Sequence, residues 1–273
     1  MKRLMAALLA ALALFSVAFA AEPVDLTTYT DEELDALRVQ VAEEIRARAA
    51  AKAPENPAAD FRYVSNGREV RIVEYIGNSG NVYIPDEIDG VPVTQIFDDL
   101  FNGSVNVDFD ALLNGSELGL HSIRLPAKLV SIGEDAFHST FFLEHELVMP
   151  KTLKSIDMCA FWSSSIPGLV LQSDCELSQY AFAYSELKFC YIREGAAVEL
   201  GPAVFTDTPM EVAVIPADVT QISSSVFDSC NNLTVYCPAG SYAEQYCKEN
   251  FIVCDTANYE AMVAYYEALY PAE

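Results

Sequence analysis

The apolar residues between Leu120 and Phe137 follow a pattern that returns several times along the chain. Leu120, Ile123 and Leu125 have strand-like spacing before a proline, and Ile132 and Phe137 follow. The phenylalanines that close successive copies stand 24, 21, 23 and 22 residues apart, at Phe137, Phe161, Phe182, Phe205 and Phe227. A period in the low twenties is typical of a solenoid of the leucine-rich type, in which each repeat contributes one supersecondary unit.

The alternation within each copy predicts which side chains enter the core. The residues expected to point inward are Leu120, Ile123, Leu125, Leu147, Met149, Leu169, Leu171, Cys190 and Ile192. Their segments should form parallel strands stacked about 4.8 Å apart, with the isoleucine and phenylalanine of each copy on the opposite side of the core. A small residue stands three positions after each phenylalanine, at Ser104, Thr140, Ser164, Ser185, Thr208 and Cys230. We expect these to form a ladder that bonds the backbone of the neighbouring repeat.

The clearest copy has Leu-Pro, then Ser-Ile-Gly, then Ala-Phe, which ends at Phe137. The copy that ends at Phe161 has Met-Pro, Ser-Ile and Ala-Phe, and the copy that ends at Phe227 has Ile-Pro, Gln-Ile and Val-Phe. This pattern resembles the BspA-type leucine-rich repeat, and the resemblance runs from about Phe61 to Cys254. The two weaker copies carry Gln172 and Arg193 in place of the proline. The resemblance implies a secreted or surface protein that binds other macromolecules, with no catalytic residue to carry over and no cofactor.

The expected fold is therefore an α/β solenoid, a right-handed stack of about six leucine-rich repeats with a parallel β-sheet, an N-terminal β-hairpin cap and a C-terminal helical cap. Asn66-Gly67 between two β-prone runs predicts the hairpin, which would cover the open first edge of the stack. Ser241 followed by Glu244 is a capping box that predicts a short helix at the other end. An extra stretch near residues 104–119 is expected to be a surface loop.

The chain divides into four predicted regions. Residues 1–20 read as a signal peptide, because a basic start precedes an apolar run that ends in Ala-Phe-Ala. An uncleaved membrane anchor is the competing interpretation, since the apolar run approaches spanning length. Residues 21–60 predict a helix and a linker, residues 61–254 the repeat domain with its caps, and residues 255–273 an amphipathic tail.

The charge balance excludes some partners. Removing Lys2 and Arg3 from the 16 basic residues leaves 14 against 40 acidic ones, a net charge of −26. Such a surface repels phosphate backbones and anionic lipid, so neither nucleic acid nor, after signal cleavage, a membrane is an expected partner. The charge suits a protein that stays soluble outside the cell.

Metal and nucleophile chemistry have little support in the sequence. His121 and His145 occupy the same place in successive repeats and could form a partial metal site with Glu146, but no fourth ligand is apparent, so no metal is expected. The seven cysteines contain no CxxC pair, and their odd number leaves at least one thiol without an internal partner. Cys237 and Cys247 are expected to lie close enough to bridge, with two separate buried thiols as the alternative.

An apolar stripe on the strands is the candidate binding surface. Seven residues that should face outward form it: Val148, Val170, Phe189, Tyr191, Val212, Val214 and Tyr236. A stripe of that extent, about 24 Å across six strands, usually marks a binding site when it is exposed. Two other interpretations stay open, namely that the tail helix covers the stripe or that these residues merely suit parallel strands.

Three functions follow from these observations. The first is a secreted, non-enzymatic protein that binds an extracellular protein or glycan. The second is a structural surface protein that associates with itself through its two terminal helices. The third is a secreted hydrolase, for instance one with a cysteine nucleophile, which is disfavoured because no catalytic motif is present and the polar turn residues are expected to act as ladder members.

Overall fold

A computed structural model describes the chain over four ranges, residues 55–77, 79–101, 122–140 and 146–271. The chain forms two units, one of Pro54–Ala264 and one that combines Met1–Ala53 with Tyr265–Glu273. The larger unit contains the repeats. The predicted signal peptide, the helix before the linker and the insertion near residues 104–119 lie outside the described residues.

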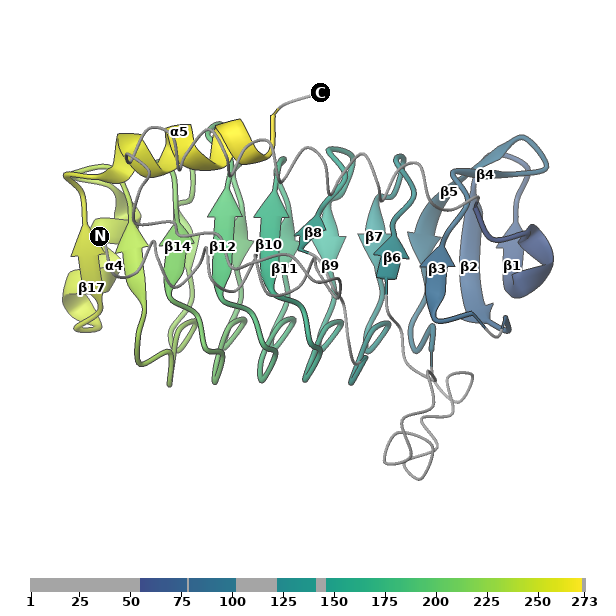
Figure 1. Cartoon of the computed structure of the whole chain (residues 1–273), viewed down its shortest axis with the longest axis horizontal. Coiled ribbons are helices and arrows are strands. Elements are labelled where there is room, and N and C mark those ends of the chain that lie inside the picture. The colour runs from purple at the N-terminus through teal and green to yellow at the C-terminus, as the bar shows by residue number, and fades with distance from the viewer. Residues whose placement is uncertain (1–54, 78, 102–121, 141–145, 272–273) are drawn as a thin grey trace, which may run out of the picture. The chain divides into compact units, whose positions relative to one another are not determined.

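The predicted strands form a parallel sheet along the larger unit (Figure 1). Its order is β17-β16-β14-β12-β10-β8, with bounds β8 Leu147–Val148, β10 Gly168–Leu171, β12 Phe189–Ile192, β14 Val212–Val214, β16 Thr234–Tyr236 and β17 Val253–Asp255. Leu169 lies in register with Leu147 on one side and with Cys190 on the other. A separate parallel pair joins β3 (Asn81–Tyr83) to β6 (Ser122–Arg124). The predicted solenoid with parallel strands is confirmed.

A second sheet faces the first across the core, and the sequence analysis did not predict it. Its main path is β1-β2-β5-β7-β9-β11-β13-β15, with bounds β1 Phe61–Ser65, β2 Val70–Tyr75, β5 Val91–Ile96, β7 Ser131–Ile132, β9 Ser155–Ile156, β11 Glu176–Leu177, β13 Glu199–Leu200 and β15 Gln221–Ile222. From β7 onward each strand has two residues, one inward and one outward, so Leu177 pairs with Ile156 and Leu200 inside the core. Two-residue strands are too short to show an alternation in the sequence.

The inward residues of the first strands are placed as predicted. Seven of the nine are buried, Leu125 is partly buried against the same core, and Leu120 lies outside the described residues. The isoleucines at 132, 156 and 222 and all five repeat phenylalanines are buried on the opposite side. The prediction that apolar side chains fill the core of each repeat from two opposite sides is confirmed.

The phenylalanines form a continuous aromatic column through the larger unit. Neighbouring ring centroids are 4.8 to 6.3 Å apart along Phe61, Tyr75, Phe101, Phe137, Phe161, Phe182, Phe205, Phe227 and Tyr246. Phe137, Phe161 and Phe182 are nearly parallel, with interplanar angles of 6° and 3°. The first two rings come from the N-terminal cap and the last from the C-terminal helix, so both caps extend the core.

The small polar residues after each phenylalanine are buried, but their partner differs from the expected one. The hydroxyls of Thr140, Ser164, Ser185 and Thr208 donate to the phenylalanine carbonyl of their own turn, at 2.7 to 2.9 Å. The prediction that they bond the neighbouring repeat is wrong for these four, because a side chain three residues past a carbonyl in a tight turn reaches that carbonyl first. Cys230 alone follows the predicted pattern among the described members, since its thiol lies 3.1 Å from the carbonyl oxygen of Phe205 one repeat earlier.

The N-terminal hairpin cap is confirmed. β1 and β2 are antiparallel, Gly67 has φ 80°, and the Asn66 side-chain oxygen accepts from the N–H groups of Arg68 and Glu69. A second hairpin joins β4 (Glu87–Ile88) to β5 through Asp89-Gly90, both with positive φ. This hairpin was not predicted, although Asp-Gly between paired strands is itself a hairpin signal.

Two helices follow the last full repeat. α4 (Tyr242–Glu249) begins at the predicted cap Ser241, whose hydroxyl accepts from the N–H of Glu244. α5 (Tyr259–Leu269) lies in the predicted tail. Neither helix, nor any other in the described part of the chain, is long and apolar enough to cross a bilayer.

Candidate functional site

The seven residues of the predicted binding surface, here called the sheet stripe, lie together on neighbouring strands, but most are not exposed. Val170, Tyr191 and Val214 have no exposed surface, and Val212 and Tyr236 expose 7% and 8%. Phe189 is partly buried, and Val148 is 41% exposed at the edge strand β8. Five of the seven members are therefore buried rather than open to a partner, and the role of the stripe in binding stays a prediction.

Local packing accounts for part of this burial. Phe189 pairs with Gly168 on the neighbouring strand, and a Cβ added to Gly168 would meet the phenyl ring at 2.1 Å. The ring thus occupies the space that a side chain at position 168 would need. Arg193 places its guanidinium carbon 6.0 Å from the ring centre of Tyr191. Phe189 and Tyr191, the two aromatic residues of the central strand β12, thus both pack against neighbouring residues.

The first turn of the tail helix lies beside the end of strand β12. Tyr259 and Val263 belong to the larger unit and are 2% and 8% exposed. The Tyr259 hydroxyl donates to the Glu194 carboxylate, two residues after β12, at 3.0 Å. Burial and then this carboxylate raise the pKa of Tyr259 well above its ordinary value, and Tyr191 contributes to the increase. These contacts favour the interpretation in which the tail covers the middle of the stripe, around Tyr191.

A different part of each repeat remains accessible. We call the five turns at residues 133–140, 157–164, 178–185, 201–208 and 223–230 the turn ridge. In every turn the residues two before and two after the phenylalanine have positive φ, between 53° and 63°, although none is glycine. A left-handed conformation costs an ordinary residue roughly 1–2 kcal/mol, so it persists only where the surroundings stabilise it.

Hydrogen bonds between turns provide that stabilisation. In the first turn the N–H groups of Asp135, Phe137 and Ser139 donate to carbonyls of the next turn at 3.2, 2.7 and 2.8 Å. The same three positions donate forward in the second and third turns, and two of them do so in the fourth. The alternation of left-handed and right-handed residues turns these donors to one side, which makes the ridge a regular, hydrogen-bonded platform.

Three aromatic side chains lie side by side on this platform and form what we call the aromatic row. The Trp162 ring centre is 4.7 Å from that of His138 and 5.3 Å from that of Tyr184. Tyr184 is 49% exposed, Trp162 is partly exposed, and Met158 and Tyr180 on the same turns are exposed as well. The chain's only tryptophan is therefore part of an accessible aromatic surface.

The turn ridge has an excess of negative charge. Its sequence contains five carboxylates, Glu134, Asp135, Asp157, Asp207 and Asp228, and no lysine or arginine. The Asp135 carboxylate lies 3.3 Å from Nδ1 of His138. Burial, and next the charge of Asp98, raise the pKa of Asp157 above its ordinary value of 3.8. An aromatic row bordered by carboxylates can bind cations, because both the ring faces and the carboxylates attract positive charge.

The aromatic row was not predicted from the sequence because its members do not occupy equivalent repeat positions. His138 and Trp162 follow their phenylalanines by one residue, whereas Tyr184 follows its phenylalanine by two. Their contact depends on the left-handed turn geometry. The one signal in the sequence was the pair His138 and Trp162, which share a position in consecutive copies.

Other reactive groups occupy structural positions. Cys190 is buried in the core, and burial raises the pKa of the Cys175 thiol to about 12, so neither resembles an activated nucleophile. His121 and His145, from the partial metal site, lie outside the described residues. Over the described ranges, no group of three or more His, Cys, Asp or Glu side chains is arranged to hold a metal ion.

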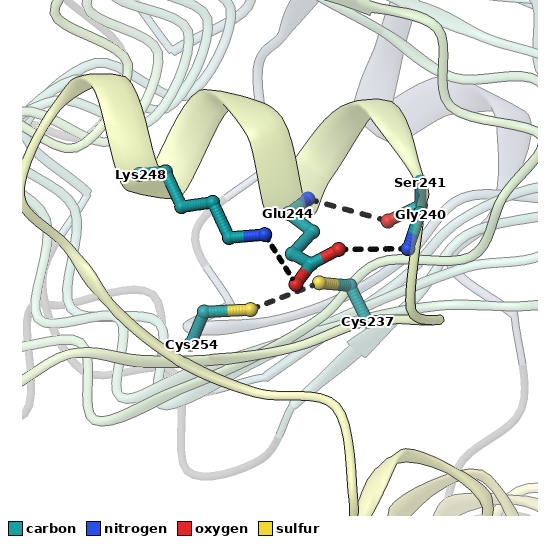
Figure 2. A network of polar contacts seen from close by, with 6 residues as sticks. All are labelled: Cys237, Gly240, Ser241, Glu244, Lys248 and Cys254. Atoms are coloured by element: carbon teal, nitrogen blue, oxygen red, sulfur yellow. Dashed lines mark hydrogen bonds and ion pairs between the residues drawn. The ribbon is translucent and has the colours of Figure 1, made fainter.

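The C-terminal cap has a compact polar network (Figure 2). Glu244 accepts from the backbone N–H of Gly240 at 2.7 Å and pairs with Lys248 at 2.6 Å. In a capping box this carboxylate accepts from the N–H of the capping residue, here Ser241. It accepts from Gly240 instead, because the Ser241 N–H already donates to the Pro238 carbonyl. The Lys248 contact, and then the Gly240 N–H, lower the pKa of Glu244.

Comparison with protein families agrees with the repeat pattern. Residues 115–234 match the model of the BspA type leucine rich repeat region, in six copies. Over these residues the repeats therefore match the BspA type. A search of curated protein sequences found no match.

Several solved structures resemble this chain. A Treponema pallidum leucine-rich repeat protein is 23% identical, with 67% of this chain and 71% of that one covered and a TM-score of 0.41. A leucine-rich repeat protein from Bacteroides ovatus is 19% identical, with 65% and 45% covered and a TM-score of 0.44. A leucine-rich cell surface protein from Faecalibacterium prausnitzii is 18% identical, with 69% and 55% covered and a TM-score of 0.41.

Proposed function

We propose that this chain is a non-enzymatic interaction module, exported to the cell surface or beyond, that binds a protein or glycan partner through the aromatic row of the turn ridge. The N-terminal signal pattern and the BspA-type repeats support export. The turn hydroxyls support a non-enzymatic role, because four of them are committed to carbonyls of their own turns. The observation that carries the proposal is the accessible contact of Trp162 with His138 and Tyr184.

The charge of the ridge indicates which partners suit it best. Five carboxylates without a compensating lysine or arginine favour a partner that carries positive charge. Trp162 is the best cation–π acceptor among the side chains present. A basic segment of a protein, with lysines or arginines along an extended backbone, matches both features, whereas a neutral glycan would use the rings alone.

Binding to immobilised poly-lysine, compared with poly-glutamate and neutral dextran, tests this proposal. The exported chain, residues 21–273, is expected to bind poly-lysine and to weaken as salt rises. Replacing Trp162 with alanine and Tyr184 with serine together should weaken binding about 5- to 30-fold, since exposed cation–π contacts contribute roughly 0.5–1 kcal/mol each. The double variant keeps every charge, so the loss would report on the rings.

Two matched controls separate the ridge from the general acidity of the chain. Phe251→Ala removes a ring that is 96% exposed outside the ridge and should leave binding unchanged. Asp207→Asn on the ridge should weaken binding more than Glu176→Asn, because Glu176 is an exposed carboxylate on the second sheet. Equal effects of these two acid changes, or full binding by the ring variant, would overturn the assignment to the ridge.

The sheet stripe is the second candidate face. Its tyrosines and valines would become available to a partner if the tail helix moved away, so the tail would act as a displaceable lid. Tyr191→Ser should then weaken partner binding only in a chain that lacks the tail. Loss of poly-lysine binding on Tyr191→Ser in the chain without the tail, together with full binding by the Trp162 and Tyr184 variant, would favour the stripe over the ridge.

Self-association remains the alternative function, and the exposed edge strand β17 favours it. Val253 in this strand is 64% exposed, and Phe251 just before it is 96% exposed. Unprotected edge strands with apolar side chains pair readily with other chains. Light scattering after size exclusion should show dimers or larger species that Val253→Lys disperses; a monomer at all concentrations would rule this function out.

A further inference from the structure

Three of the seven cysteines converge at the C-terminal cap. Cys237 directly follows β16, Cys247 lies in α4, and Cys254 lies in β17. The sulfur atoms of Cys237 and Cys254 are 3.2 Å apart (Figure 2). Cys247 is 1% exposed, and both other thiols are close enough to affect its ionisation. The sequence predicted that Cys237 lies close to Cys247, whereas the thiol contact that the structure gives to Cys237 is with Cys254.

The strand register explains this contact. Val235 of β16 lies opposite Cys254 of β17 in the parallel pair. Cys237 stands two residues after Val235, and residues two apart in an extended chain point to the same side. Both sulfur atoms therefore turn toward the interior beneath α4, diagonal to each other across neighbouring strands.

We infer that Cys237 and Cys254 are the site of a disulfide bond, formed by exchange with a small-molecule or protein disulfide, which closes a loop around α4. Disulfide sulfur atoms lie 2.03–2.05 Å apart, so the pair must approach by about 1.2 Å, within the reach of side-chain rotation. This inference does not depend on the aromatic row or on any partner that the row binds.

The chemistry proceeds in two exchange steps. Cys254 is the more accessible of the two thiols, so its thiolate attacks the oxidant disulfide, forms a mixed disulfide and releases one oxidant thiolate. The Cys237 thiolate then attacks the Cys254 sulfur and displaces the second oxidant thiolate. The two protons lost by the cysteines neutralise these thiolates, so two protein thiols are oxidised while one disulfide is reduced to two thiols.

Burial controls when this reaction can occur. It raises the pKa of the Cys237 thiol to about 12, which leaves little thiolate in the folded cap at neutral pH. Bond formation is therefore expected to be faster before α4 packs over the last repeat than afterwards. Because terminal layers of a repeat stack have a neighbour on one side alone, a bond across this cap should slow the opening of that end.

Peptide mapping of the full exported chain, refolded with oxidised and reduced glutathione, tests the inference. After alkylation under denaturing conditions, cleavage after Glu244 and Lys248 places the three cap cysteines on separate peptides. We expect a linked pair containing Cys237 and Cys254, roughly 2 Da lighter than the sum of its reduced peptides, with Cys247 alkylated. Alkylation of both Cys237 and Cys254, or a link that includes Cys247, would overturn the inference.

Variants supply a second measurement. Cys247→Ser should keep the link, Cys254→Ser should lose the link to position 254, and circular dichroism checks that each variant folds. If Cys247→Ser does not fold, Cys247→Ala replaces it, because alanine leaves no buried hydroxyl without a partner. Oxidation should raise the Tm of the wild type and the Cys247 variant by several degrees and leave that of Cys254→Ser unchanged. An equal rise in all three would show that the bond lies elsewhere.

Discussion

Replacing Phe161 with alanine removes the central ring of the aromatic column. The side chain has no exposed surface, and its ring is stacked between Phe137 at 4.8 Å and Phe182 at 4.9 Å. Emptying a buried phenylalanine site costs about 3–5 kcal/mol. The loss of two close ring pairs, each about 0.5–1.5 kcal/mol beyond area burial, places this substitution near the upper end. We therefore expect about 5 kcal/mol of destabilisation.

Thermal unfolding and hydrogen exchange together measure this effect. At about 2–4 °C per kcal/mol for a domain of this size, the Tm should fall by about 10–20 °C. Because repeats contact only their neighbours, amide protection should fall first in the turns that hold Phe137 and Phe182. Phe251→Ala, at a residue that is 96% exposed, is the control and should change stability by less than about 0.5 kcal/mol. A loss below about 1 kcal/mol for Phe161→Ala would refute the column as a source of stability.

Three further substitutions or deletions test other features. Ser164→Ala removes the donor to the Phe161 carbonyl at 2.7 Å and should cost about 1 kcal/mol in urea unfolding, while an equal cost for the exposed Ser224→Ala would contradict this. Asp157→Asn should stabilise the fold at pH 7, because the raised pKa penalises the ionised carboxylate in the folded state; that advantage should disappear below about pH 3.8, and a variant less stable at pH 7 would reverse the assignment. Deleting residues 257–273 should expose the sheet stripe and increase the binding of a hydrophobic dye, and unchanged dye binding would show that the tail does not cover it.

Most of the core could be predicted because the same spacing of apolar residues recurs in each repeat. Leu169 and Phe182 belong to a weak copy without the proline, yet the period placed both correctly inside. Periodicity does not help where an element is too short to show it, as with the two-residue strand Glu176–Leu177. The Asp89-Gly90 hairpin was present as a local signal, and we gave it too little weight.

The candidate site was harder to predict because it depends on contacts between distant segments. The outward direction of Tyr191 and Val214 followed from the strand pattern, but their burial depends on groups elsewhere in the sequence. Tyr259 reaches Glu194 across 65 positions, a separation at which local patterns give no information. Trp162 meets Tyr184 only because the turns between them adopt left-handed residues that the sequence, with no glycine at those positions, does not indicate.

The hydrogen bonds that run from each turn to the next give the turn ridge a net dipole along the stack. Peptide N–H groups that all point from one turn to the next align their dipoles, much as in a helix, although here the axis runs along the stack. The carbonyl, negative end of this array lies at the N-terminal turns, where Glu134 and Asp135 also lie. Attraction for a cation therefore strengthens toward His138 and weakens toward the C-terminal cap. A partner with unevenly spaced positive charges would thus be held in one orientation, its most basic end over the first turns.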